Sequence, residues 1–128
     1  LIDGQSRTVM AAADVVLMAS GTATLEGLLL NKPMVVGYRV GAVTYAIVSR
    51  LIKSEFFSLP NLLCRQEMVP ELLQSQLTTE AIVAAVRRWF DQPEQAQALK
   101  IQFQSVHQQL RGGASEKAAA AVARLLEA

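Results

Sequence analysis

The sequence predicts an α/β fold, in which a partial Rossmann-like parallel sheet is followed by C-terminal helices. Two observations favour this class. In residues 1–66, short apolar runs alternate with helix-like segments, and after Gln66 only helical patterns follow. Strands that alternate with helices form βαβ units, whose strands run parallel. We therefore expect a Rossmann-like portion over 1–66 and a helical portion of the same domain over 67–128.

The strands are expected in the first portion. Each predicted strand is a short, continuous apolar run, which is typical of a strand buried on both faces of a parallel sheet. These runs are Val15–Ala19, Met34–Tyr38 and a brief one at Phe56–Leu59 that ends at Pro60-Asn61, with Leu1-Ile2 as the tail of a further strand.

Three helices are predicted between these strands. They are Ser6–Ala13, capped by its first residue, then Thr22–Asn31 and Ala42–Lys53. Asn31, with a proline two residues later, is typical of a helix end. The apolar helix 42–53 could touch a membrane or an acyl chain, but packing on the sheet is the preferred interpretation.

The second portion contains three further helical patterns. Thr78 or Thr79 is expected to cap the first of them, and Pro93 begins the second. Gly112-Gly113 separates the second from an alanine-rich third. No strand is predicted in this portion.

Composition limits the functions open to the chain. Its 128 residues suffice for one domain, and a net charge of +1 gives no electrostatic reason to expect nucleic acid as a partner. Cys64 is the only cysteine, which excludes an internal disulfide and fits a reducing cytoplasm; we expect a semi-buried thiol. No apolar run approaches the ~20 residues of a membrane span. Because the chain begins at Leu1 rather than Met, we expect a fragment of a longer protein.

The turn Ser20-Gly21-Thr22 is the first candidate site. It follows a predicted strand and opens a predicted helix, so several backbone N–H groups and two hydroxyl groups point to one place. The helix dipole adds partial positive charge, which suits a phosphate or diphosphate. Ligands of open α/β sheets bind beyond the carboxyl ends of the strands, where this turn lies. The alternative is that Ser20 or Thr22 only caps the helix.

Glu26 lies about one turn inside the same helix. A capping-box acid stands three residues after the cap, and the residues in those places are Ala23 and Leu25, so Glu26 is not a box partner. Its carboxylate could accept hydrogen bonds from the two vicinal hydroxyls of a ribose next to the diphosphate. The alternative is an exposed acid that the helix dipole favours.

Three sequence blocks, in the same order, resemble the C-terminal part of the lipid-A-disaccharide synthase family. The blocks are ASGTATLEGLLLNKPMVVGYR (19–39), SLPNLL (58–63) and VPELLQ (69–74), and GGAS (112–115) precedes the last helix. That family consists of glycosyltransferases with two Rossmann-like domains, the GT-B class. The resemblance covers nearly the whole chain and implies the donor-binding half of such an enzyme.

The resemblance implies a reaction and its substrates. A 2,3-diacylglucosamine unit would pass from UDP to lipid X, giving a β-1,6-linked disaccharide in lipid A biosynthesis. A cytoplasmic protein that associates peripherally with the inner membrane is expected, and a homo-oligomer is left open.

The resemblance also implies roles for particular residues. The diphosphate would be held by the turn, the ribose by the helix glutamate, and Asn61 would lie close to the reacting sugar or acceptor. Tyr38 and Arg39, at the end of a predicted strand, would line the same crevice. The substrate-binding residues are thus Ser20, Gly21, Thr22, Glu26, Tyr38 and Arg39, with Asn61 as the catalytic candidate.

An inverting transfer without a metal or cofactor is expected. The aspartates Asp3, Asp14 and Asp91 are isolated, so there is no D-x-D pair to hold a divalent cation. The helix N terminus and side chains would stabilise the leaving UDP instead. No carboxylate is placed to be the general base, which is expected on the N-terminal half, so this fragment alone is expected to be inactive.

Two other functions are open on sequence alone. One is another GT-B enzyme that uses a UDP-sugar, such as a murein glycosyltransferase or a UDP-N-acetylglucosamine epimerase. The other is a non-catalytic nucleotide-binding module.

Overall fold

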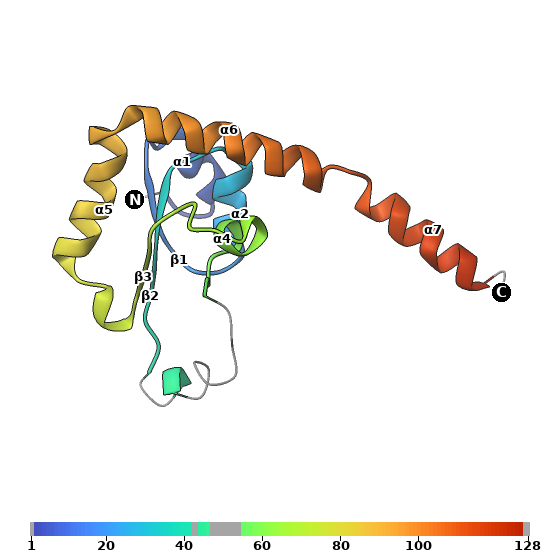
Figure 1. The fold of residues 1–128 in the computed structure, drawn as a ribbon, viewed down its shortest axis with the longest axis horizontal. Coiled ribbons are helices and arrows are strands. Elements are labelled where there is room, and N and C mark those ends of the chain that lie inside the picture. The colour runs from blue at the N-terminus through green and yellow to red at the C-terminus, as the bar shows by residue number, and fades with distance from the viewer. Residues whose placement is uncertain (1, 42–43, 47–54, 127–128) are drawn as a thin grey trace.

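The computed structural model describes residues 2–41, 44–46 and 55–126. Leu1 and most of the predicted helix Ala42–Lys53 lie outside the described residues; of that helix, 44–46 are described and are helical. The described residues form a parallel sheet flanked by helices (Figure 1), which confirms the predicted α/β class.

The sheet has three parallel strands in the order β1-β2-β3. They are β1 (Val16–Ala19), β2 (Met34–Tyr38) and β3 (Glu71–Leu73). Val16 pairs with Met34, and Val36 pairs with Glu71. The first two strands confirm the predicted ones to within one residue at each end. Because all three strands run in the same direction, their carboxyl ends lie at one edge of the sheet.

The prediction of a strand at Phe56–Leu59 was wrong. Helix α4 (Leu59–Cys64) begins there instead, with Ser58 as its N-cap residue. Pro60 explains the difference: it stands in the first helical turn, where a missing N–H group costs no hydrogen bond. The proline that was expected to end a strand therefore helps to begin a helix.

The third strand lies instead in the portion 67–128 that was predicted to be helical. The N–H group of Val36 donates to the Pro70 carbonyl (2.9 Å), and Gly37 pairs with Leu72. Strand β3 has only three residues, begins with a glutamate and follows a proline. It is therefore not the continuous apolar run by which a buried strand is recognised in a sequence. The sheet therefore draws its strands from both sides of the predicted boundary at Gln66.

The remaining helices agree closely with the predicted ones. They are α1 (Ser6–Ala12), α2 (Thr22–Leu29), α5 (Thr79–Asp91), α6 (Pro93–Leu110) and α7 (Ala114–Leu126), with a short 3₁₀ turn η1 (Gln74–Gln76). The Thr78 hydroxyl caps α5 by accepting from the Ala81 N–H (3.2 Å), as predicted. Ser6 caps nothing, because the N-cap residue of α1 is Gln5 and makes no side-chain cap bond. Asn31 has a φ of 55°, the left-handed conformation expected just after a helix.

The helices form layers on the two faces of the sheet. In Figure 1, α5 lies on one side of the strands and α2 and α4 lie on the other. Helix α6 packs against both α2 and α5, so it joins the two layers. Helix α7 continues beyond α6 and leads away from the sheet (Figure 1).

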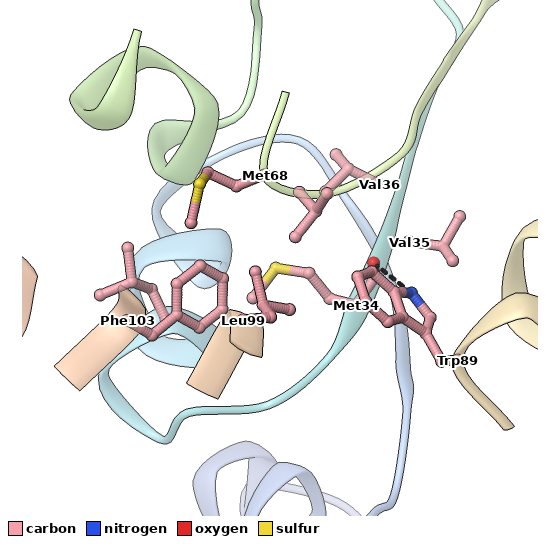
Figure 2. Close-up of a cluster of buried hydrophobic side chains, with 9 residues drawn as sticks. Met34, Val35, Val36, Met68, Trp89, Leu99 and Phe103 are labelled. Atoms are coloured by element: carbon pink, nitrogen blue, oxygen red, sulfur yellow. Dashed lines mark hydrogen bonds between the residues drawn. The ribbon is translucent and has the colours of Figure 1, made fainter. Parts of the chain in front are cut away.

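The core is built around β2, the central strand. Figure 2 shows Val35 pointing to the opposite side of the strand from Val36, as the two-residue period of a strand requires. On one face, Phe103 and Leu99 of α6 pack against the cluster; both are buried. On the other, Trp89 of α5 is buried, and its indole N–H donates to the Met34 carbonyl (3.1 Å). Both layers are thus anchored on β2.

Replacing Phe103 by alanine should destabilise the chain by about 3–5 kcal/mol, because it leaves a cavity where a fully buried ring was. Ile101→Ala on the same helix is the matched control. That side chain is 59% exposed, so its loss should change the free energy of unfolding by no more than about 0.5 kcal/mol. Denaturant unfolding measures both, and similar losses would contradict the assigned core.

Candidate functional site

The junction of β1 and α2 has the geometry of an anion site. Ser20 and Gly21 are the turn between the strand and Thr22, the first residue of α2. Gly21 has a φ of 146°, which side-chain-bearing residues rarely adopt, although a Cβ atom there would meet nothing within 4 Å. Among the described residues, Gly21 is the N-cap residue of α2, and no side-chain cap hydrogen bond is made there. The alternative in which Ser20 or Thr22 caps the helix is therefore contradicted. The Thr24 N–H donates to the Gly21 carbonyl (3.1 Å), and the N–H groups of Thr22 and Ala23 have no acceptor within the helix.

Ser20 does not offer its hydroxyl proton to this opening. Its Oγ donates to the carbonyl oxygen of Phe57 (2.9 Å), and a carbonyl can only accept. A phosphate oxygen also only accepts at neutral pH, so the committed proton is the one that a diphosphate would need. Ser20 as described holds the neighbouring loop, and its predicted contact with the diphosphate requires that bond to break.

Thr24 forms a second connection between the turn and the same loop. Its hydroxyl is buried beneath the turn, donates to the Gly21 carbonyl (2.7 Å), and accepts from the N–H of Leu59 (3.3 Å). Thr22 by contrast is exposed. Thr22 is thus the exposed hydroxyl residue at this turn, whereas the hydroxyl groups of Ser20 and Thr24 form hydrogen bonds within the protein.

Glu26 forms an ion pair that the sequence analysis did not foresee. The guanidinium of Arg7 on α1 donates to Glu26 Oε1 from Nη2 (3.0 Å) and Nε (3.2 Å). The two side chains are 78% and 32% exposed, so solvent screens the pair. A separation of 19 residues between different elements leaves no periodic signal in the sequence. Arg7 brings a cation to the second turn of α2, close to the open helix end.

Tyr38 and Arg39 lie at the carboxyl edge, as expected, but face different partners. Tyr38, with Ser20 and Gly21, lines a cavity of about 300 Å³ that Phe57 also borders. This is the predicted meeting of the turn with the end of β2. Arg39 instead donates from Nη2 to the carbonyl oxygens of Gln74 (3.1 Å) and Leu77 (3.3 Å). Its side chain therefore binds the η1 turn after β3.

Asn61 is fully buried, and each polar group of its side chain is bonded within the protein. Its Nδ2 donates to the Val69 carbonyl (2.9 Å) and to Glu71 Oε1 (2.8 Å). Its Oδ1 accepts from the N–H groups of Met68 (2.7 Å) and Val69 (3.0 Å). An amide offers two donor hydrogens and two acceptor sites, so all four are used. The geometry favours a structural role for Asn61 over the predicted one at the sugar.

Glu71 is the other residue that the sequence analysis missed. It stands in the VPELLQ block, was not considered as a candidate, and borders a cavity of about 580 Å³ together with Tyr45 and Gln74. Its carboxylate accepts from the backbone N–H groups of Phe57 (2.8 Å) and Ser58 (2.9 Å). It links β3 to the loop that also binds Ser20.

The part of the chain that the structure describes offers few other reactive or metal-binding side chains. Cys64 is half-buried, as predicted, and burial raises the pKa of its thiol, which disfavours the nucleophilic thiolate. Within residues 2–41, 44–46 and 55–126, no three His, Cys, Asp or Glu side chains gather where they could hold a metal ion. None of the described helices is long and apolar enough to cross a membrane.

Comparison with known proteins gives one consistent result. The family model described as lipid-A-disaccharide synthetase matches residues 1–125. The lipid-A-disaccharide synthase of Cellvibrio japonicus has 53% sequence identity with this chain over 99% of the chain's length. That of Xanthomonas campestris has 50% identity over 98% of the chain. The enzyme of the same name from Xylella fastidiosa is 49% identical to 99% of it. The chain spans 33%, 29% and 34% of these relatives, about a third of their length. Its placement in their C-terminal part stays a prediction.

Replacing Asn61 by alanine should destabilise the protein by about 3 kcal/mol or more, because the buried N–H groups of Met68 and Val69 lose their acceptor. Gln66→Ala is the control, since it removes an exposed amide from the same segment and should cost about 0.5 kcal/mol or less. Thermal or denaturant unfolding measures both variants. A normal stability in Asn61→Ala would contradict the structural role.

Proposed function

The chain belongs to the lipid-A-disaccharide synthetase family, and we propose that it forms the nucleotide-sugar side of a glycosyltransferase active site. The proposed reaction of the whole protein is transfer of 2,3-diacylglucosamine from UDP to lipid X. The observation that carries the proposal is the uncapped N terminus of α2, which opens beside the Ser20–Gly21 turn at the carboxyl edge of the sheet.

The diphosphate of the donor binds at the open end of α2. The N–H groups of Thr22 and Ala23 have no acceptor within the helix, whereas that of Thr24 donates to the Gly21 carbonyl (3.1 Å). The helix dipole makes this end partly positive. The Thr22 hydroxyl is exposed there and can donate to a phosphate oxygen. Gly21 supports this by its backbone conformation, since a φ of 146° is strained for other residues. Main-chain groups thus supply most of the recognition.

The ribose lies beside Glu26 in this arrangement. The carboxylate has two oxygens, and both Arg7 contacts go to Oε1. Vicinal ribose hydroxyls are donors, so a charged carboxylate binds them more strongly than a neutral amide does.

Bond breaking is assisted by the same helix end. As the glycosidic bond to UDP breaks, negative charge grows on the diphosphate oxygen, and fixed N–H dipoles that already point at it stabilise the leaving group. The sugar develops positive charge and is attacked by the acceptor hydroxyl, whose proton a general base removes. We assign that base to the N-terminal half that is expected of a two-domain enzyme.

The acyl chains of the proposed donor and acceptor determine where in the cell the reaction takes place. Substrates of this kind reside in a membrane, so we propose peripheral contact with the cytoplasmic surface of the inner membrane. A homo-oligomer stays a prediction. Membership of the family argues against the murein glycosyltransferase and epimerase alternatives, and turnover of UDP-2,3-diacylglucosamine with lipid X by the full-length protein decides against a non-catalytic module.

Glu26→Gln in the full-length protein should weaken UDP binding on the order of tenfold to a few hundredfold, since the loss of charge assistance at the ribose costs about 1.5–3 kcal/mol in total. The variant should also discriminate much less between UDP and 2′-deoxy-UDP. Stability should fall by no more than about 1 kcal/mol, because the ion pair with Arg7 is exposed. Calorimetric titration of both nucleotides measures the ratio.

Arg7→Ala is the matched control for that experiment. It breaks the same ion pair but keeps the carboxylate, so the ratio of UDP to 2′-deoxy-UDP affinity should stay close to that of the unmodified protein. If Glu26→Gln leaves the ratio unchanged, Glu26 is an exposed helix acid and the ribose assignment fails.

Thr22→Ala should weaken UDP binding about three- to tenfold through the loss of one hydrogen bond to the diphosphate. Because Thr22 does not reach the ribose in the proposed arrangement, the preference for UDP over 2′-deoxy-UDP should stay intact. The same titrations test this. A loss of ribose preference without a loss of overall affinity would reverse the proposed placement of the nucleotide.

A further inference from the structure

Four hydrogen bonds converge on the carboxylate of Glu71. Oε2 accepts from the Phe57 N–H (2.8 Å), while Oε1 accepts from the Ser58 N–H (2.9 Å), the Ser58 hydroxyl (2.6 Å) and Asn61 Nδ2 (2.8 Å). We call these four residues (Phe57, Ser58, Asn61 and Glu71) the Glu71 brace. The brace fixes the start of α4 to β3.

One peptide group carries this constraint on to the candidate site. The peptide between Phe57 and Ser58 donates its N–H to Glu71 Oε1 and accepts the Ser20 hydroxyl at its carbonyl. Each end of a single rigid, planar group is therefore bonded, one to β3 and the other to the turn after β1. Strand β2 lies between β1 and β3 in the sheet, so the loop makes a connection that the sheet itself does not.

A second path joins the same two parts. The next N–H group, that of Leu59, donates to the Thr24 hydroxyl, which in turn donates to the Gly21 carbonyl. The turn is thus held from both Ser20 and Gly21, and both contacts depend on where residues 57–59 lie. Glu71 is the side chain that holds that segment from the other side.

The brace requires a carboxylate at position 71. The four groups that bond to it within the described residues are all donors, and an ionised carboxylate is an acceptor at both oxygens. In Glu71→Gln the amide can still present oxygen to the three donors at Oε1. Its NH₂ group then meets the N–H of Phe57, donor against donor. The size of the side chain is kept, and one backbone bond of the segment is lost.

We propose that Glu71 is a positioning residue for the Ser20–Gly21–Thr22 turn and acts through the Phe57–Ser58 peptide; its importance for UDP rests on the function proposed above. Glu71 does not touch the nucleotide in this arrangement. It fixes the turn so that the open end of α2 and the Thr22 hydroxyl face the diphosphate before the ligand arrives. Preorganised donors bind more tightly because less order has to be gained on binding.

The first test measures backbone hydrogen exchange in full-length Glu71→Gln without ligand. Exchange should rise on the order of tenfold in peptides that cover 57–59 and 20–24, while peptides from α6 stay unchanged. Glu67→Gln is the control, because Glu67 is exposed and borders the same cavity but is not a member of the brace. Unchanged exchange at 20–24 in Glu71→Gln overturns the proposal.

The second test is a double-mutant cycle on UDP binding. Glu71→Gln should weaken UDP about three- to tenfold, and Ser20→Ala should do the same by removing the other end of the connection. The double variant should bind UDP no worse than the weaker of the two single variants. If Glu71 has only a structural role, Glu71→Gln lowers stability and leaves UDP affinity unchanged, which overturns the proposal. The proposal is also overturned if the double variant loses affinity by the product of the two single fold-changes.

Two further outcomes are decided by the same measurements. If the unmodified protein binds no UDP, the proposed function fails, while the exchange test still decides whether Glu71 fixes the turn. If Glu71→Gln does not fold, Ser58→Ala takes its place, because it removes one donor to Oε1 and keeps both backbone bonds. A smaller rise in exchange at 20–24 then supports the proposal, and no rise overturns it.

Discussion

The need to satisfy buried polar groups around Glu71 and Asn61 determines how the candidate site of this chain is built. A buried amide and a half-buried carboxylate are costly unless each donor and acceptor is matched. Here Asn61 uses all four of its positions, and Glu71 accepts four bonds. Since the partners come from α4, β3 and the loops beside them, satisfying these groups fixes how the elements lie relative to one another. The position of residues 57–59, and with it that of the turn at Ser20, follows from that placement.

The bonds that hold residues 57–59 are linked to the absence of a side-chain cap on α2. A side-chain cap on α2 would stabilise it by about 1 kcal/mol, and two small polar residues stand where a cap is expected. Instead the Ser20 hydroxyl points to Phe57 and the Thr24 hydroxyl to Gly21. The stabilisation that a cap gives is thus replaced by bonds to a braced loop. The N–H groups of Thr22 and Ala23 then remain for the proposed anion, while the turn beside them is held in place by these bonds.

Local patterns predicted the fold well where one element suffices to explain them. Continuous apolar runs identified β1 and β2, and Thr78 and Pro93 marked helix starts that the structure confirms. The third strand was misplaced because Pro60 can end a strand or begin a helix, and the bonds that Glu71 accepts at the start of α4 come from a residue eleven positions later in the chain. The Arg7–Glu26 pair likewise joins two helices across 19 residues. Neither contact leaves a repeat in the sequence, so pattern analysis could name Glu26 and Asn61 but not their partners.

The small residues of the ASGTATLE block therefore divide into two groups with different reasons to be small. Ser20 and Thr24 turn inward: one reaches the Phe57 carbonyl, and the other is buried under the turn between Gly21 and Leu59, where a longer side chain would displace the loop. Gly21 and Thr22 turn outward, one for its backbone conformation and the other for an exposed hydroxyl. The block that resembles a single anion-binding motif thus also contains residues that stabilise the fold. In the proposed arrangement the anion is bound mainly by backbone N–H groups, so the inward-facing residues determine how well those groups are aimed.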